Sequence, residues 1–84
     1  GVGDKFRTFQ RVTVRQSPTE AGGIDASRWS GWEGEIVTAY RESWHNSHPY
    51  VVYEVRLQRS GGRVVFQPIT ENWLESAEEA LAAD

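Results

Sequence analysis

The sequence predicts an all-β fold in which five short strands curl into a small barrel. Two observations support this: apolar and polar residues alternate along several short segments, and stretches rich in Gly, Pro and Ser separate these segments. The chain has 84 residues and no cysteine, so it forms at most one domain, with a small core and no disulfide. Because a thin antiparallel sheet must bend on itself to bury one face, a barrel is the expected architecture.

The first predicted strand covers residues 10–15, an alternating segment in which Val12 and Val14 share one face. Pro18 follows shortly after and ends the strand, because proline has no N–H to donate to a ladder. We expect a long loop over residues 17–31, because this stretch is rich in Gly and Ser.

The second predicted strand covers residues 34–41. Strict alternation places Ile36, Thr38 and Tyr40 on one face and the residues between them on the other. Gly34 opens this strand and marks a point where the backbone can kink or approach another segment closely.

The third predicted strand, residues 50–58, is the clearest in the chain and follows a polar loop at 42–49. Its inward face is expected to consist of Val51, Tyr53, Val55 and Leu57. A tight turn at 59–63 contains two glycines, which adopt positive φ without steric cost. The return strand, 64–67, is expected to stop at Pro68.

The end of the chain is expected to contain one 3₁₀ turn, a stub strand at Trp73–Leu74 and a marginal helix over 75–83. The predicted domain organisation has three parts: an N-terminal extension at 1–8, the barrel at 9–76 and an acidic C-terminal tail at 77–84.

Charge is distributed unevenly along the chain. The formal net charge is −3, but residues 71–84 carry five acidic residues and no basic one, and all nine basic residues lie between Lys5 and Arg63. The acidic end would repel a phosphate backbone, so nucleic acid is not the expected partner. No apolar run approaches the ~20 residues that a membrane span needs, so we expect no membrane segment. The absence of cysteine fits a cytoplasmic location.

Three segments carry a resemblance to a known group of proteins. They are FQRVTVRQSP at 9–18, WEGEIVTAY at 32–40 and YVVYEVRLQRSGGRVVFQPITENWLE at 50–75. Their order resembles the SH3-like barrel of the electron-transport accessory superfamily, which includes the nitrile hydratase β subunit, the variable chain of ferredoxin–thioredoxin reductase and photosystem I subunit IV. The resemblance implies an SH3-like barrel that serves as an accessory module, and it supports fold more than function.

The type II plasmid dihydrofolate reductase shares this fold and the pattern Trp-x-Gly-x-Ile-Val-x-x-Tyr. In this chain the pattern falls on Trp32, Gly34, Ile36, Val37 and Tyr40. In that family several chains form one pore, lined by Val-Gln-Ile-Tyr just before a proline. Here Val65, Phe66 and Gln67 occupy the places of the glutamine, isoleucine and tyrosine. The resemblance therefore leaves a self-assembled pore enzyme with an altered site as one alternative.

No set of residues predicts catalysis or metal binding. His45 and His48, with Glu42 nearby, supply too few ligands for a tetrahedral zinc site. Ser43 or Ser47 beside a histidine lacks an orienting third group. Neither glycine-containing stretch forms a nucleotide-binding loop. We therefore predict no catalytic residue, no metal and no cofactor.

Aromatic side chains in the loops are the stronger candidates for function. Loop aromatics give large contact area with little side-chain entropy to lose. The predicted partner-binding residues are Trp29, Trp32, Trp44 and Tyr50, with Arg28 and Arg41 at their rim. The alternative is that the rings fold inward and complete a small core.

The sequence favours a non-catalytic protein-interaction module that docks on a larger protein or on copies of itself through these aromatics. Two alternatives remain open at this point: the pore enzyme, and a weak nucleic-acid-binding barrel in which aromatics stack on bases.

Overall fold

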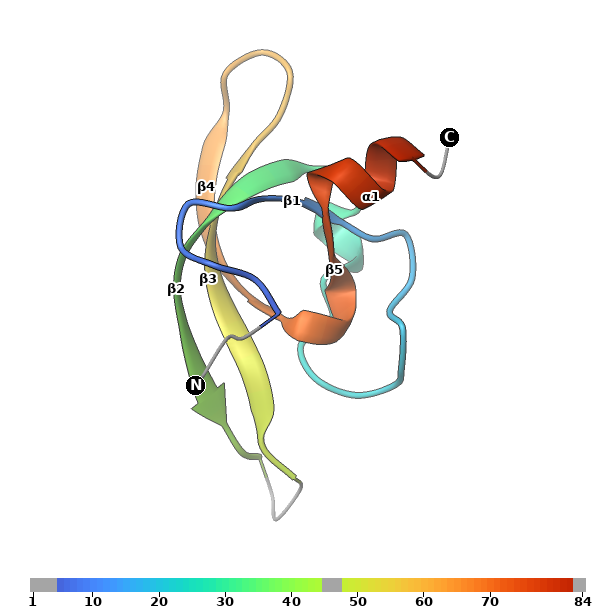
Figure 1. Ribbon diagram of the computed structural model, residues 1–84, viewed down its shortest axis with the longest axis vertical. Coiled ribbons are helices and arrows are strands. Elements are labelled where there is room, and N and C mark those ends of the chain that lie inside the picture. The colour runs from blue at the N-terminus through green and yellow to red at the C-terminus, as the bar shows by residue number, and fades with distance from the viewer. Residues whose placement is uncertain (1–4, 45–47, 83–84) are drawn as a thin grey trace.

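The computed structural model describes residues 5–44 and 48–82, and these form an all-β domain with one short helix (Figure 1). The elements are β1 (Arg11–Val14), the 3₁₀ turn η1 (Ser27–Trp29), β2 (Glu33–Glu42), β3 (Tyr50–Gln58), β4 (Val64–Thr70), the 3₁₀ turn η2 (Glu71–Trp73), β5 (Leu74–Ser76) and α1 (Ala77–Ala82). The predicted all-β class is confirmed, as are the 3₁₀ turn before the last strand and the short C-terminal helix.

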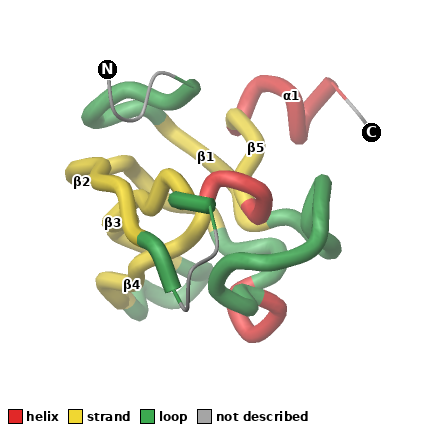
Figure 2. Tube along the Cα trace, turned by 90° about the horizontal axis from the view of Figure 1, so that it is seen from below, coloured by secondary structure: helices red, strands yellow, loops and turns green. Residues whose placement is uncertain are grey.

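The five strands form one antiparallel sheet in the order β4-β3-β2-β1-β5. Figures 1 and 2 show the sheet curving around a central core. The expected closure is wrong: among the described residues, the edge strands β4 and β5 do not pair with each other. Four successive antiparallel pairs leave β4 and β5 running in the same direction, and parallel neighbours need a connection of about a dozen residues. The connection here is only the 3₁₀ turn η2.

A β-bulge in β2 changes which of its side chains point toward the core. The pairing with β3 shifts between Ile36 and Thr38, which leaves Val37 as an extra residue in β2. A one-residue shift moves all later side chains to the opposite face. Ala39 therefore packs against the core and Tyr40 is exposed. The prediction that Ile36, Thr38 and Tyr40 share one face is wrong for this reason.

Strand β4 does not stop at Pro68 but continues to Thr70, which corrects the sequence prediction. The N–H of Arg59 donates to the carbonyl of Arg63 at 3.2 Å, which makes these two residues a hydrogen-bonded pair. Because hydrogen-bonded and non-hydrogen-bonded pairs alternate, Pro68 falls in a non-hydrogen-bonded pair with Glu54. Its ring nitrogen faces the open edge, so the ladder to β3 loses no bond.

Aromatic and aliphatic side chains from every strand fill the core. At its centre Tyr53 is fully buried, and its hydroxyl donates to a carboxylate oxygen of Glu71 at 2.7 Å. The ring of Phe6 meets the Tyr53 ring edge-on, with centroids 5.3 Å apart. Phe6 is buried although the predicted boundary placed it in an N-terminal extension. Residues 5–8 therefore contribute to the domain.

The turn at 59–63 adopts the predicted conformation, with φ of +102° at Gly61 and +89° at Gly62. In the described part of the chain, no helix has the length and apolar character to cross a membrane. The helix α1 is six residues long and buries no residue completely.

Phe9 is held in a backbone conformation that suits glycine. Its φ is +69°, at the third position of a turn closed by the Gln10 N–H donating to the Arg7 carbonyl at 3.0 Å. Its side chain is 75% exposed. We expect Phe9→Gly to raise the free energy of unfolding by about 1 kcal/mol, because glycine adopts this φ without strain and little packing is lost. Urea unfolding measures the change.

Phe9→Ala is the matched control, since alanine removes the same ring but keeps the strain. It should leave the unfolding free energy nearly unchanged. A Phe9→Gly variant no more stable than Phe9→Ala would show that the positive φ at residue 9 costs no strain, and a loss of stability in both variants would show that the ring contributes to folding.

Candidate functional site

The two tryptophans of the long loop belong to the core. Trp29 is 9% exposed and Trp32 is 6% exposed, and their rings meet edge-to-face with centroids 5.1 Å apart. Three arginines cover their outer sides, at 4.9 to 5.9 Å from the ring centroids: Arg28 over Trp29, and Arg59 and Arg63 over Trp32. Neither ring presents a face for stacking on a partner, so the inward alternative fits this pair.

The remaining predicted aromatics lie at the start of β3. The rings of Trp44 and Tyr50 have centroids 5.6 Å apart, and the rings of His48 and Tyr50 have centroids 4.6 Å apart. Arg41 is exposed near the end of β2, opposite Val51 of β3. The structure therefore brings Trp44 and Tyr50 together with His48. No ring contact within the described ranges joins them to the tryptophan pair of the long loop.

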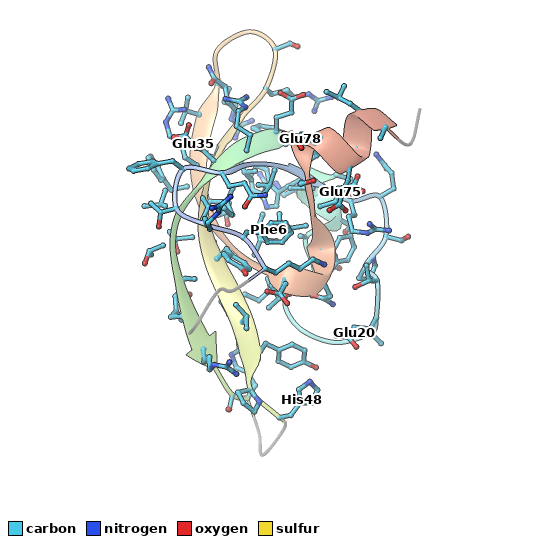
Figure 3. The ribbon with its side chains drawn as sticks, in the orientation of Figure 1. Phe6, Glu20, Glu35, His48, Glu75 and Glu78 are labelled. Carbon is cyan, nitrogen blue, oxygen red and sulfur yellow. The ribbon has the colours of Figure 1, made fainter. Side chains whose placement is uncertain are left out.

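A cleft of about 260 Å³ opens beside this row of rings. Four parts of the chain form it: the segment before β1, the long loop after β1, the approach to β3 with its first residues, and η2. Figure 3 shows Glu20 on the long loop and His48 before β3 at the same end of the molecule. The lining residues are Lys5, Thr19, Glu20, His48, Pro49, Tyr50, Val51, Glu71 and Asn72.

Asn72 fixes one wall of the cleft. Its side-chain Nδ2 donates to the carbonyl of Glu20 at 2.8 Å and to the carbonyl of Gly22 at 2.9 Å. Its own carbonyl accepts a hydrogen bond from the N–H of Thr19 at 2.8 Å. The side chain is buried, and Oδ1 has no hydrogen-bond partner among the residues that the structure describes. These bonds hold the long loop against η2 and give the cleft a rigid wall.

Two glycines let the long loop lie this close to the sheet. Gly22 and Gly23 have φ of +101° and +78°. A Cβ at Gly22 would overlap the Tyr50 hydroxyl, and a Cβ at Gly23 would overlap the side chain of Thr70. The hydroxyl of Thr70 accepts a hydrogen bond from the N–H of Ile24 at 3.1 Å. The loop is therefore anchored at both η2 and the end of β4.

The charges around the cleft are mostly acidic. Glu20 is exposed and Glu71 is half-buried, and neither forms an ion pair within the described residues. Lys5 supplies one opposing charge, with its Nζ 5.5 Å from the centroid of Phe6. The cleft thus combines a row of rings, two carboxylates and a fixed backbone.

Two groups outside the cleft have shifted pKa values. A hydrogen bond from the Ser27 N–H at 2.9 Å lowers the pKa of Asp25 in the long loop. On the outer face of β2, partial burial and the carboxylates of Glu42 and Glu54 raise the pKa of Tyr40. These shifts affect the loop and the outer sheet face and leave the cleft chemistry unchanged.

A wider hollow of about 510 Å³ lies between residues 5–11 and α1. Its walls carry Lys5, Arg7 and Arg11 on one side and glutamates of α1 on the other. This hollow offers no exposed ring to a partner, because Phe6 is the only aromatic residue in its described lining and is buried. The smaller cleft beside Tyr50 is therefore the better candidate site.

Of the residues predicted from the sequence to bind a partner, Tyr50 lines the cleft and Trp44 contacts its ring. The histidines at 45 and 48 are candidates from the sequence only as metal ligands or as a base beside a serine. The sequence gave no indication of Glu20 and Asn72, which lie in segments that read as a loop and a turn. Among the described residues, no three side chains of the metal-binding types are placed to share an ion. His45 and Ser47 lie outside the described residues.

Comparisons with protein-family models, with curated proteins and with solved structures found no match in any of the three. The function is therefore inferred from the chain's own residues.

Proposed function

We propose that this chain is a non-catalytic protein-interaction module, a curved, open five-stranded sheet of the SH3-like kind that holds an extended segment of a partner protein. The binding site is the cleft between the long loop, η2 and the start of β3. The observation that carries the proposal is that the rings of Tyr50 and His48 line one cleft with Glu20 and Glu71, neither of which forms an ion pair among the described residues. The ring of Trp44 contacts that of Tyr50 outside the cleft lining.

Each part of the cleft suits a peptide. The rings offer contact area that is already ordered, so little side-chain entropy is lost on binding. The two carboxylates line the same cleft as the Tyr50 ring, and together they favour a cationic side chain through charge and cation–π attraction. The hydrogen bonds of Asn72 fix the loop wall before the partner arrives, which reduces the ordering cost of binding. We infer a partner segment that presents arginine or lysine.

The nucleic-acid alternative gains no support from the cleft, because carboxylates repel phosphates. A cytoplasmic location remains part of the proposal and rests on the cysteine-free composition.

The direct test uses the smallest probe with the inferred chemistry. N-acetyl-arginine amide is titrated into ¹⁵N-labelled protein, and N-acetyl-citrulline amide serves as the uncharged control of the same shape. We expect the arginine probe alone to shift the backbone amides of Glu20, Tyr50 and Asn72. Short peptides selected from a phage-displayed random library then supply a tighter ligand. Equal chemical-shift changes with both probes would contradict the proposed preference for a cationic side chain.

Variants test the assignment of the cleft residues. We expect Tyr50→Ala to weaken binding of a selected peptide about tenfold, since ring contacts with a cation contribute roughly 1–2 kcal/mol. Tyr40→Ala is the matched control, because Tyr40 is also partly exposed but lies outside the cleft. Fluorescence polarisation measures both affinities. Equal losses in the two variants would contradict the proposed site.

A further inference from the structure

Strand β4 has one backbone edge that pairs with no other strand in the described part of the chain. It is the terminal strand of the sheet, at the end of the row β2, β3, β4 (Figure 2). The hydrogen bond that closes the 59–63 turn fixes the alternation along β4. By this alternation the backbone N–H and C=O groups of Val64 and Phe66 point away from β3, as does the nitrogen of Pro68.

The usable part of this edge is short and well defined. Pro68 has no N–H to offer there. The side chain of Thr70 is fully buried under the long loop, where it accepts the N–H of Ile24. Within the described residues, Val64 and Phe66 are therefore the positions clear of the loop that offer both an N–H and a carbonyl at this edge. Open strand edges of this kind are templates for pairing with another strand.

The side chains at the free edge are apolar and exposed. Val64 is 37% exposed and Phe66 is 58% exposed, and alternation places them together on the outer face of the sheet. Natural edge strands usually carry charges at such positions to prevent pairing. In β4 only the half that contains Pro68 and Thr70 is protected from pairing with another strand, by the proline and by the long loop.

We propose that β4 pairs with β4 of a second copy of this chain, antiparallel, about a two-fold axis at Val65. In this register Val64 lies opposite Phe66 of the second copy, and Phe66 lies opposite its Val64. All four outward backbone groups of each strand then form hydrogen bonds. The outer face gains two aromatic–β-branched cross-strand pairs, a favourable combination.

The backbone itself selects this register. An axis at Phe66 would place the carbonyl of Val64 opposite the proline nitrogen of Pro68, which cannot donate. An axis at Val64 would require Gly62 to be extended, but its φ is +89°. With the axis at Val65, Arg63 faces Gln67 of the second copy, so no like charges meet. Self-complementarity of this kind is what an isologous dimer requires.

Two measurements on the whole chain test the dimer. Sedimentation equilibrium should show the mass rising toward twice the monomer value between about 20 µM and about 1 mM, as mass action requires for a weak dimer. Over the same range, amide hydrogen exchange at Val64 and Phe66 should slow at least ~10-fold, while Val65 and Gln67, already bonded to β3, stay protected throughout.

Variants at Phe66 separate edge pairing from other contacts. Phe66→Pro removes one outward N–H without touching the β3 ladder, as Pro68 already does, and should remain monomeric. Phe66→Lys should also be monomeric, while Val37→Lys, on an exposed apolar residue away from this edge, should dimerise normally. A monomeric mass at the highest concentration, a dimer that survives both Phe66 changes, or slowing of exchange at other amides instead would overturn the proposal.

Discussion

Gly34→Ala is expected to lower the free energy of unfolding by about 3 kcal/mol, as overpacking in a tight core does. A Cβ at this position would lie 2.7 Å from a methyl carbon of Val55, 2.8 Å from the carbonyl oxygen of Arg56 and 3.0 Å from a methyl carbon of Leu57. The carbonyl oxygen belongs to the adjacent strand β3, so it cannot move away without distorting the β2–β3 ladder. Gly34 pairs with strands on both sides, which leaves no free direction for relaxation.

Urea unfolding of the Gly34→Ala variant gives the size of this effect. Gly61→Ala is the informative control: a Cβ there meets nothing within 4 Å, but its φ is +102°. Gly61→Ala should lower the free energy of unfolding by only about 1 kcal/mol, which is the conformational penalty for a side chain at positive φ. If Gly34→Ala were the milder of the two, close approach of β2 and β3 would not be the reason for glycine.

The sequence located the strands because burial on one face leaves a period of two. Residues 50–58 were assigned with their observed bounds, since every inward position there is apolar. The bulge at Val37 could not be predicted from this period of two. Val37 lies in a run of β-branched residues, where an extra residue changes which side chains face the core without changing the composition.

Pro68 and the tryptophans of the long loop could not be placed from the sequence because their environment depends on distant parts of the fold. A proline interrupts a central strand but not an edge strand, and edge position depends on the strand order of the whole sheet. Likewise, a tryptophan in a loop is exposed or buried according to the path of that loop. Trp29 and Trp32 are buried because the loop turns back over the core.

The cleft could be predicted only in part. Aromatic residues near β3 could be predicted as candidates because rings in loops give contact area with little side-chain entropy to lose. The opposite wall depends on Asn72, whose amide donates to two backbone carbonyls. Because every residue has a backbone carbonyl, the sequence does not identify the partners of Asn72. Gly22 and Gly23 predict a loop from the sequence alone. That the loop needs glycine there depends on the positions of Tyr50 and Thr70, which a Cβ would overlap.

Asn72→Asp should be the most damaging single change near the cleft. Aspartate has the same shape as asparagine, so packing is conserved, but a carboxylate would face the carbonyls of Glu20 and Gly22 in place of an amide donor. A buried charge without a partner typically costs about 3–5 kcal/mol. Asn72→Ala, which loses the two bonds but buries no charge, should cost about 2 kcal/mol.

The pH dependence identifies the cause of the Asn72→Asp penalty. Burial and the two carbonyls would raise the pKa of the new carboxyl above its usual value of about 3.9. The unfolded variant then releases this proton at lower pH than the folded variant does. Relative to the Asn72→Ala variant, Asn72→Asp should therefore lose stability as pH rises through the folded pKa and recover it as pH falls, because the protonated group can again donate.

Urea unfolding of both variants between about pH 4 and about pH 7 measures this difference. Hydrogen exchange at the Thr19 amide, which bonds to the Asn72 carbonyl, reports whether the long loop has left η2. A penalty of equal size at both pH values would mean that the side chain of residue 72 does not hold the loop through its amide. In that case the cleft wall would not be preformed, and peptide binding would have to supply the ordering of the loop.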